Sequence, residues 1–129
     1  MSRVRWLERG LVSSPVYLAL CRSEQALQRE LRRLRIPAKD WPQFLGGTAS
    51  ASTMIFSNSD DETACIVCIG DVSEDTPTRV AALLVHEAVH VWQEVKRVMG
   101  ETDPSSEFEA YSVQSISQKL FDAFVESEQ

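Results

Sequence analysis

The chain has 129 residues, of which 43% are hydrophobic and 25% are charged, and its formal net charge is −6. This length is enough for one domain with a modest core, so we expect residues 1–129 to form a single domain. No apolar run reaches the roughly 18 residues of a membrane-spanning helix, and the N-terminus lacks the apolar core of a signal peptide. We therefore expect a cytoplasmic protein with no membrane partner.

Basic residues concentrate near the N-terminus. Residues 1–39 hold nine Lys and Arg against three acids, whereas residues 40–129 hold four against sixteen. Such an excess suits either a surface for nucleic acid or another acidic partner, or the solvated face of an amphipathic helix. No nucleic-acid motif accompanies it, so we favour the solvated face and expect no nucleic-acid partner. The basic residues in and after the predicted helix are Arg29, Arg32, Arg33, Arg35 and Lys39.

The first elements along the chain are a short apolar run and a helix. Residues 16–21 suit a strand or a buried helical turn. Ser23 is a typical N-cap and predicts a helix to about Arg35. The helix should end before Pro37, because the residue that precedes a proline avoids helical angles. The residues predicted to face inward are Ala26, Leu27, Leu31 and Leu34.

Residues 51–56 and 64–69 predict two strands, and the polar residues 57–63 between them predict a β-hairpin. The second strand is continuously apolar and should be central, whereas the first mixes polar and apolar residues as an edge strand would. Cys65 and Cys68 have C-x-x-C spacing, but residues three apart on a strand point to opposite faces. We therefore interpret both as small core residues and not as zinc ligands or a redox pair.

Two long helices should complete the chain. Thr76 and Pro77 predict the start of a helix that runs to about Met99, with Gly100 as its C-terminal stop. After a short turn, a last helix should begin either at Asp103-Pro104 or at a capping box formed by Ser106 and Glu109. We expect this last helix to fold back antiparallel against the preceding one.

The predicted helix over 77–99 contains the pattern His86-Glu87-Ala88-Val89-His90, which is the H-E-x-x-H signature of zinc peptidases. Histidines four apart lie on one face of a helix and can bind one metal ion. Glu87 lies about 100° round the helix from His86, where its carboxylate can reach a water on that metal. His86 and His90 are the only histidines in the chain. The alternative is a core helix with two hydrogen-bonded histidines, which would be costly to bury.

Catalytic zinc usually takes three protein ligands, and the candidates for the third are carboxylates. Glu94 lies on the same helix as the two histidines, and one straight helix cannot easily direct three side chains at a single metal ion. Glu107 and Glu109 begin the last helix but lie about 200° apart, so both cannot face one metal. Glu107 shares its face with the small Ala110, which allows close helix approach, whereas Glu109 suits a helix-dipole role. Two acids of the turn also remain possible: Glu101 and Asp103.

The segment Glu107-Phe108-Glu109-Ala110 resembles the E-x-x-A segment that follows H-E-x-x-H in glutamate-type zincins. Over residues 80–115 the chain is also similar to small phage and prophage metallopeptidase-like proteins. The resemblance implies that zinc is bound by the triad His86, His90 and Glu107, with Glu87 as the general base. Several glutamate zincins have Asp where this chain has Tyr111, whose phenol could bond a histidine, a carboxylate or the substrate oxyanion, or simply pack.

We therefore expect a zinc-dependent metallopeptidase that hydrolyses a peptide or protein substrate. Glu87 would take a proton from the zinc-bound water and later protonate the leaving amine. The expected fold is α+β and minimally zincin-like: a small sheet packed on the motif helix, with the C-terminal helix closing the site. Two alternatives stay open. In the first, a structural zinc ion links the last two helices and catalyses nothing. In the second, the protein is a phage-like interaction protein whose motif is vestigial.

Overall fold

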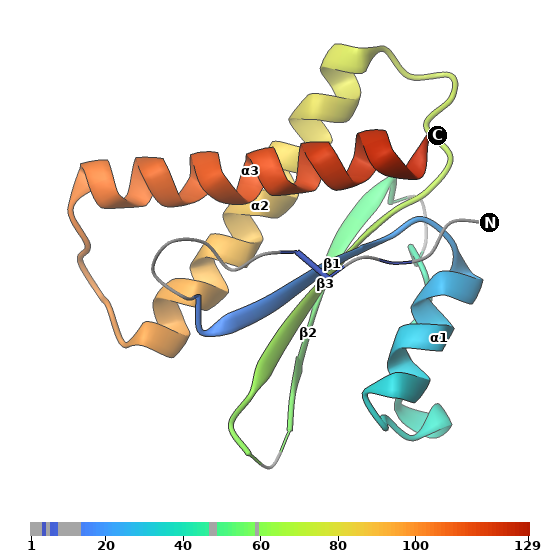
Figure 1. Cartoon of the computed structure of the whole chain (residues 1–129), viewed down its shortest axis with the longest axis horizontal. Helices are drawn as coiled ribbons and strands as arrows, with labels where there is room; N and C mark the ends of the chain where they lie inside the picture. Colours follow the sequence, from blue (N-terminus) through green and yellow to red (C-terminus); the bar gives the residue numbers. More distant parts are fainter. Residues whose placement is uncertain (1–3, 5, 8–13, 47–48, 59) are drawn as a thin grey trace.

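The computed structural model describes residues 4, 6–7, 14–46, 49–58 and 60–129. A small mixed sheet lies between one helix on one face and two helices on the other (Figure 1). The strands are β1 (Val16–Cys21), β2 (Ala51–Ser57) and β3 (Thr63–Ile69), and the helices are α1 (Glu24–Arg33), the short 3-10 helix η1 (Ala38–Asp40), α2 (Pro77–Met99) and α3 (Ser106–Ser127). This arrangement confirms the α+β class at the coarse level.

The sheet has the order β1-β3-β2, in which β3 pairs parallel with β1 and antiparallel with β2. The predicted hairpin is confirmed, with β3 central and β2 at the edge; one residue of its turn, Ser59, lies outside the described residues. Every residue of β3 is buried, because the sheet is covered on both faces. The apolar run 16–21 is a strand, which the sequence left undecided.

The two faces of the sheet build two hydrophobic clusters. Cys65, Val67 and Ile69 pack toward α2 and α3, whereas Ile66 and Cys68 pack toward α1. Alternation along the strand sends neighbouring side chains to opposite faces. Cys65 and Cys68 therefore lie in different clusters, as the sequence predicted.

Helix α1 begins at the predicted cap but ends early. The Ser23 side chain accepts a hydrogen bond from the Ala26 N–H, and the helix ends at Arg33. Leu34 was expected to face inward, and this was wrong: it is the C-cap residue and is 37% exposed. The cause is Arg35, whose φ of 62° turns the chain away from the helix axis.

Helix α2 follows its sequence signals at both ends. The Thr76 side chain accepts a hydrogen bond from the Arg79 N–H, and Pro77 occupies the first turn, where its missing N–H costs nothing. Gly100 ends the helix with φ of 75°, a left-handed conformation that glycine adopts without a Cβ clash. The boundaries 77–99 agree with the prediction.

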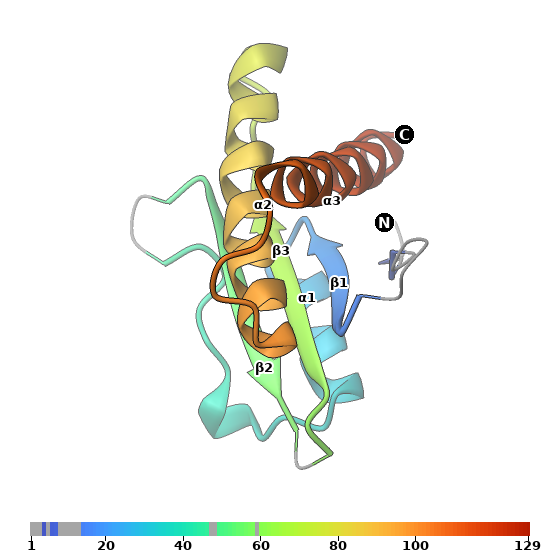
Figure 2. The ribbon, with the colours of Figure 1, turned by 90° about the vertical axis from the view of Figure 1, so that its left-hand side faces the viewer.

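Helix α3 differs from its prediction in start and in direction. Its N-cap is Ser105, whose side chain accepts a hydrogen bond from the Phe108 N–H, one residue before the predicted Ser106. Instead of folding back antiparallel, α3 crosses α2 steeply, as Figures 1 and 2 both show. The buried Leu120 of α3 belongs to the cluster between α2 and the sheet. The direction of α3 is therefore set by this apolar surface and not by the axis of α2. Among the described residues, no helix combines the length and apolar character that crossing a membrane requires.

We expect the three thiols to be inert in the folded protein. Burial raises the pKa of Cys21, Cys65 and Cys68 from 9.0 to about 12. Because only the thiolate reacts, iodoacetamide at pH 8 should leave the native chain unmodified while it alkylates all three thiols in urea, as measured by mass spectrometry. Fast alkylation of the native chain would contradict this packing.

The raised pKa values also predict that the free energy of unfolding falls as pH rises from about 9 to about 12, since the thiols of the unfolded chain lose their protons first.

Candidate functional site

The two histidines of the motif form a pair on the exposed side of α2. Their Nε2 atoms lie 3.2 Å apart, and their rings meet edge to face with centroids 4.9 Å apart. Both residues are exposed. The alternative of two hydrogen-bonded histidines on a core helix stays open, because exposure removes the cost of burial and both rings have a hydrogen-bond partner within reach. The helix presents both imidazoles to solvent, where a ligand can reach them.

The pair has the spacing that a zinc ion needs. Two nitrogens bound to zinc at about 2.0–2.1 Å with a tetrahedral angle lie about 3.3 Å apart, close to the distance found here. The Nδ1 atom of His90 lies 3.1 Å from the amide oxygen of Gln93 and donates a hydrogen bond to it. With its proton on Nδ1, His90 has a lone pair on Nε2, which is the protonation state of a metal ligand. The two histidines thus fit a metal ion, and Gln93 orients one of them.

Glu87 points between α2 and the sheet. It is 4% exposed, and its Oε1 accepts a hydrogen bond of 2.8 Å from the hydroxyl of Thr53 on β2. A buried carboxylate needs such a donor, because loss of its water shell is otherwise costly. The hydrogen bond fixes the carboxylate beside the histidine pair and connects the helix with the edge strand.

These groups line one cavity of about 520 Å³ between β2 and α2. Besides His86 and His90, its wall contains two carboxylates, Glu87 and Glu94, and one guanidinium, Arg97. Two negative groups against one positive group favour a cation in the cavity. The strand side of the wall is formed by Ala51, Ser52, Thr53 and Ile55.

Glu94 and Arg97 form an ion pair at one end of this cavity. The Arg97 guanidinium donates to both carboxylate oxygens of Glu94, which is buried while Arg97 is exposed. Its hydrogen bonds to Glu94 and the charge of that carboxylate raise the pKa of Arg97 above its ordinary value. In this structure Glu94 is therefore neutralised by Arg97.

The two glutamates at the start of α3 lie away from the histidines. Trp92 Nε1 donates a hydrogen bond of 2.7 Å to Glu109 Oε2, and the Lys96 ammonium lies 3.7 Å from the same oxygen. Trp92 lies about 200° round α2 from His90, so Glu109 is held on the opposite side of the helix. Glu107 is exposed and is not among the residues that line the histidine cavity.

The structure therefore does not bring the sequence-predicted triad together. Within the described residues, no group of three or more His, Cys, Asp or Glu side chains is placed to hold a metal ion. The steep crossing of α3 is the physical reason, because it docks the first turn of α3 on the Trp92 side of α2. Tyr111 is 64% exposed on α3 and does not line the cavity. The roles of Glu107 and Tyr111 stay predictions.

Neither a protein-family model, nor a curated protein, nor a solved structure gives a match to this chain. The function of the chain is therefore inferred from its own residues and their geometry.

The sequence reasoning missed three residues of this site. Gln93 and Arg97 follow His90 by three and seven positions, so helical spacing would have placed both on the histidine face. Thr53 carried no such signal. Its contact with Glu87 joins two segments 34 residues apart, and only the packing of α2 on β2 creates it.

Replacement of Thr53 should test the contact with Glu87. Thr53→Val keeps the side-chain shape but removes the donor, and this should lower the free energy of unfolding by about 1–3 kcal/mol because Glu87 is left buried without it. Thr53→Ser retains a hydroxyl and should be close to wild type. Urea denaturation measures both. Equal stabilities for the Val and Ser variants would show that the hydrogen bond contributes nothing.

Proposed function

We propose that this chain is a zinc-dependent hydrolase that cleaves peptide bonds. The observation that carries the proposal is the pair of Nε2 atoms 3.2 Å apart, exposed on α2 beside the buried carboxylate of Glu87. A distance of 3.2 Å is also that of a hydrogen bond between the two rings, so the buried acid held beside the pair is the feature that favours a metal site. The motif in the sequence and the cavity in the fold support the same chemistry by independent routes.

His86 and His90 would hold the ion through their Nε2 atoms. When bound, zinc polarises a carbonyl group and lowers the pKa of a coordinated water toward neutrality. The carboxylate of Glu87 lines the cavity and favours a cation there, whereas the charge of Glu94 is offset by Arg97. A proton on Nδ1 of His90, directed at the Gln93 oxygen 3.1 Å away, would leave the lone pair of Nε2 to bind the ion in place of its contact with His86.

Glu87 would act as the general base. Its carboxylate accepts a proton from the attacking water and then passes it to the nitrogen of the leaving amine. Thr53 holds one carboxylate oxygen in place, which leaves the other oxygen available for the proton. Such preorientation is what an acid–base group needs to act on a bound substrate.

The substrate would be an extended peptide segment. β2 is the outermost strand on its side of the sheet, and four of its residues line the cavity that contains the histidines. An extended chain can add to the open side of such a strand through backbone hydrogen bonds. A small sheet packed on a long motif helix is also what the minimal zincin-like architecture requires.

Glu101 and Asp103 of the turn do not line the histidine cavity, which leaves two main candidates for the third ligand. Glu94 lines the same cavity but is paired with Arg97, which would have to release it. Glu107 matches the sequence motif but would need the first turn of α3 to leave the Trp92 side of α2. The alternative function, in which zinc staples the last two helices, needs the same movement of α3, and the contacts of Glu109 with Trp92 and Lys96 oppose it.

Zinc binding is the first prediction of this proposal. Protein loaded with zinc and then dialysed should retain about one ion per chain, and His90→Ala should lose most of the affinity, because a single histidine cannot hold a catalytic zinc. Elemental analysis and competition with a chromogenic chelator measure both quantities. Wild-type protein that refuses zinc would remove the metal from the proposal.

Three further variants identify the third ligand. Loss of zinc affinity in Glu107→Ala alone would support the sequence motif, and loss in Glu94→Ala alone would support the cavity. Glu109→Ala is the matched control, because Glu109 lies in the same helix turn as Glu107 but contacts Trp92 instead of the histidines. It should reduce stability but leave zinc affinity unchanged.

Hydrolysis is the second prediction. Glu87→Gln should keep zinc bound yet reduce cleavage of any accepted peptide by at least about a hundredfold, because the proton acceptor is gone. Screening of a peptide library by mass spectrometry, followed by kinetics on a cleaved member, measures this effect. The control is Glu74→Gln, the same change at an exposed residue before α2 that is not a candidate ligand. Zinc-loaded protein that cleaves no peptide would favour the non-catalytic alternative.

A further inference from the structure

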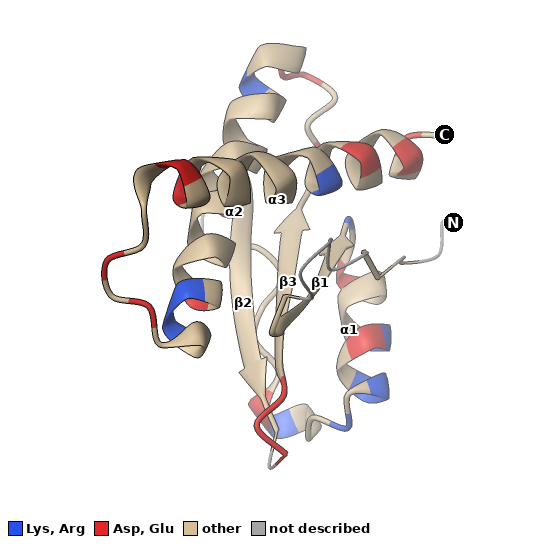
Figure 3. Ribbon diagram, turned by 60° about the vertical axis from the view of Figure 1, so that its left-hand side comes forward, with Lys and Arg blue, Asp and Glu red and all other residues tan. Residues whose placement is uncertain are grey.

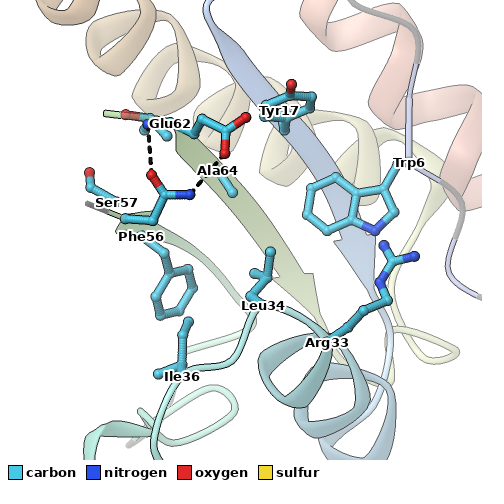
Figure 4. A pocket seen from close by; sticks show the side chains of 11 residues that line it. Trp6, Tyr17, Arg33, Leu34, Ile36, Phe56, Ser57, Glu62 and Ala64 are labelled. Carbon is cyan, nitrogen blue, oxygen red and sulfur yellow. Dashed lines mark hydrogen bonds between the residues drawn. The ribbon is translucent and has the colours of Figure 1, made fainter. Parts of the chain in front are cut away.

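A second cavity, of about 470 Å³, lies on the α1 side of the sheet, where α1 ends beside β1 and the β2–β3 hairpin. Its size falls within the roughly 300–1,000 Å³ of small-molecule sites. Figure 4 shows Phe56 and Ile36 along one wall, Leu34 at the base, and Trp6 with Arg33 on the opposite side. No residue lines both this cavity and the histidine cavity.

The walls of this cavity leave large apolar side chains open to solvent. Tyr17 is 38% exposed although it belongs to the strand β1, and Leu34 is 37% exposed. Leu34 reaches the cavity because Arg35 adopts a left-handed φ of 62° that ends α1. For a residue other than glycine this conformation costs of order 1 kcal/mol, so it is retained against a local penalty. An apolar ligand would cover these surfaces.

One charged group lies at each end of the cavity. Arg33 stacks over the Trp6 ring, with its guanidinium carbon 5.7 Å from the ring centroid. Glu30, which is buried, accepts a hydrogen bond of 2.8 Å from Trp6 Nε1 and pairs with Arg33 at 2.9 Å. This network fixes the Trp6 ring and the guanidinium together as one wall.

The opposite end of the cavity is acidic and already satisfied. Glu62 accepts a hydrogen bond of 2.9 Å from the Asn58 side chain, and both residues line the cavity (Figure 4). An anionic ligand group is repelled from this end. At the other end Arg33 is paired with Glu30 through Nη2, but its side chain is 62% exposed, so its remaining N–H groups can donate to such a group. Other basic residues also lie around the end of α1 (Figure 3).

We propose that this cavity binds a small aromatic carboxylate. The ring lies on the apolar wall formed by Leu34, Ile36 and Phe56, and the carboxylate accepts charge-assisted hydrogen bonds from Arg33. The two charged ends give the ligand one orientation. This proposal involves neither the histidines nor zinc, so it stands or falls separately from the hydrolase.

The test uses 2-naphthoate as the probe, with isothermal titration calorimetry at pH 7. Wild-type protein should bind one equivalent, and Arg33→Gln should weaken binding about tenfold, the effect of one charge-assisted hydrogen bond of about 1.4 kcal/mol. The matched control is Arg32→Gln, which removes the same charge from the next residue; Arg32 stacks over Trp41 and does not line the cavity. It should change the affinity less than twofold.

Two further measurements separate the apolar wall from the charge. The neutral isostere 2-naphthamide should bind more weakly than 2-naphthoate, and Arg33→Gln should weaken its binding less than it weakens binding of 2-naphthoate. Leu34→Glu should abolish binding of both compounds, and its exposed position allows the chain to fold, which circular dichroism checks. The proposal is overturned by absence of saturable naphthoate binding, by equal effects of the Arg32 and Arg33 variants, or by full binding to folded Leu34→Glu protein.

Discussion

The arrangement of the site depends on how helix α2 directs its different sides at the sheet, at α3 and at solvent. Val91 and its apolar companions pack on the sheet, Trp92 receives the first turn of α3, and His86 with His90 occupies the remaining side. The helix cannot rotate to exchange these sides, because each one matches its neighbour in polarity and shape. The histidines consequently stay exposed, and the same packing that exposes them holds the start of α3 on the opposite side.

Glu87 connects the motif helix α2 with the edge strand β2. Its carboxylate is buried at the boundary between α2 and β2, and Thr53 supplies the donor that makes burial tolerable. Because β2 is also the outermost strand, the residue that positions the acid lies on the strand that an extended peptide would join. A single hydrogen bond thus links the proposed base, Glu87, to β2, the strand beside which the substrate would lie.

The sheet separates two cavities with different chemistry. Thr53 faces the acidic histidine cavity, whereas Phe56, three positions further along β2, lines the apolar cavity beside α1. Side chains three apart on a strand point to opposite faces, so one edge strand contributes to both. The apolar cavity coincides with the clearest failure of the helical pattern, Leu34, and such conflicts between local pattern and structure are expected at functional sites.

The sequence by itself determined several features that depend on near neighbours. The caps Ser23 and Thr76, the hairpin with its central second strand, and the histidine spacing follow from local hydrogen bonding and periodicity. Only the tertiary structure decided the partner of Glu87 and the side of α2 on which α3 docks. Those outcomes depend on the angle at which two apolar surfaces, distant along the chain, fit together, and no local pattern encodes that angle. For this reason the histidine pair was predictable, while the position of Glu107 was not.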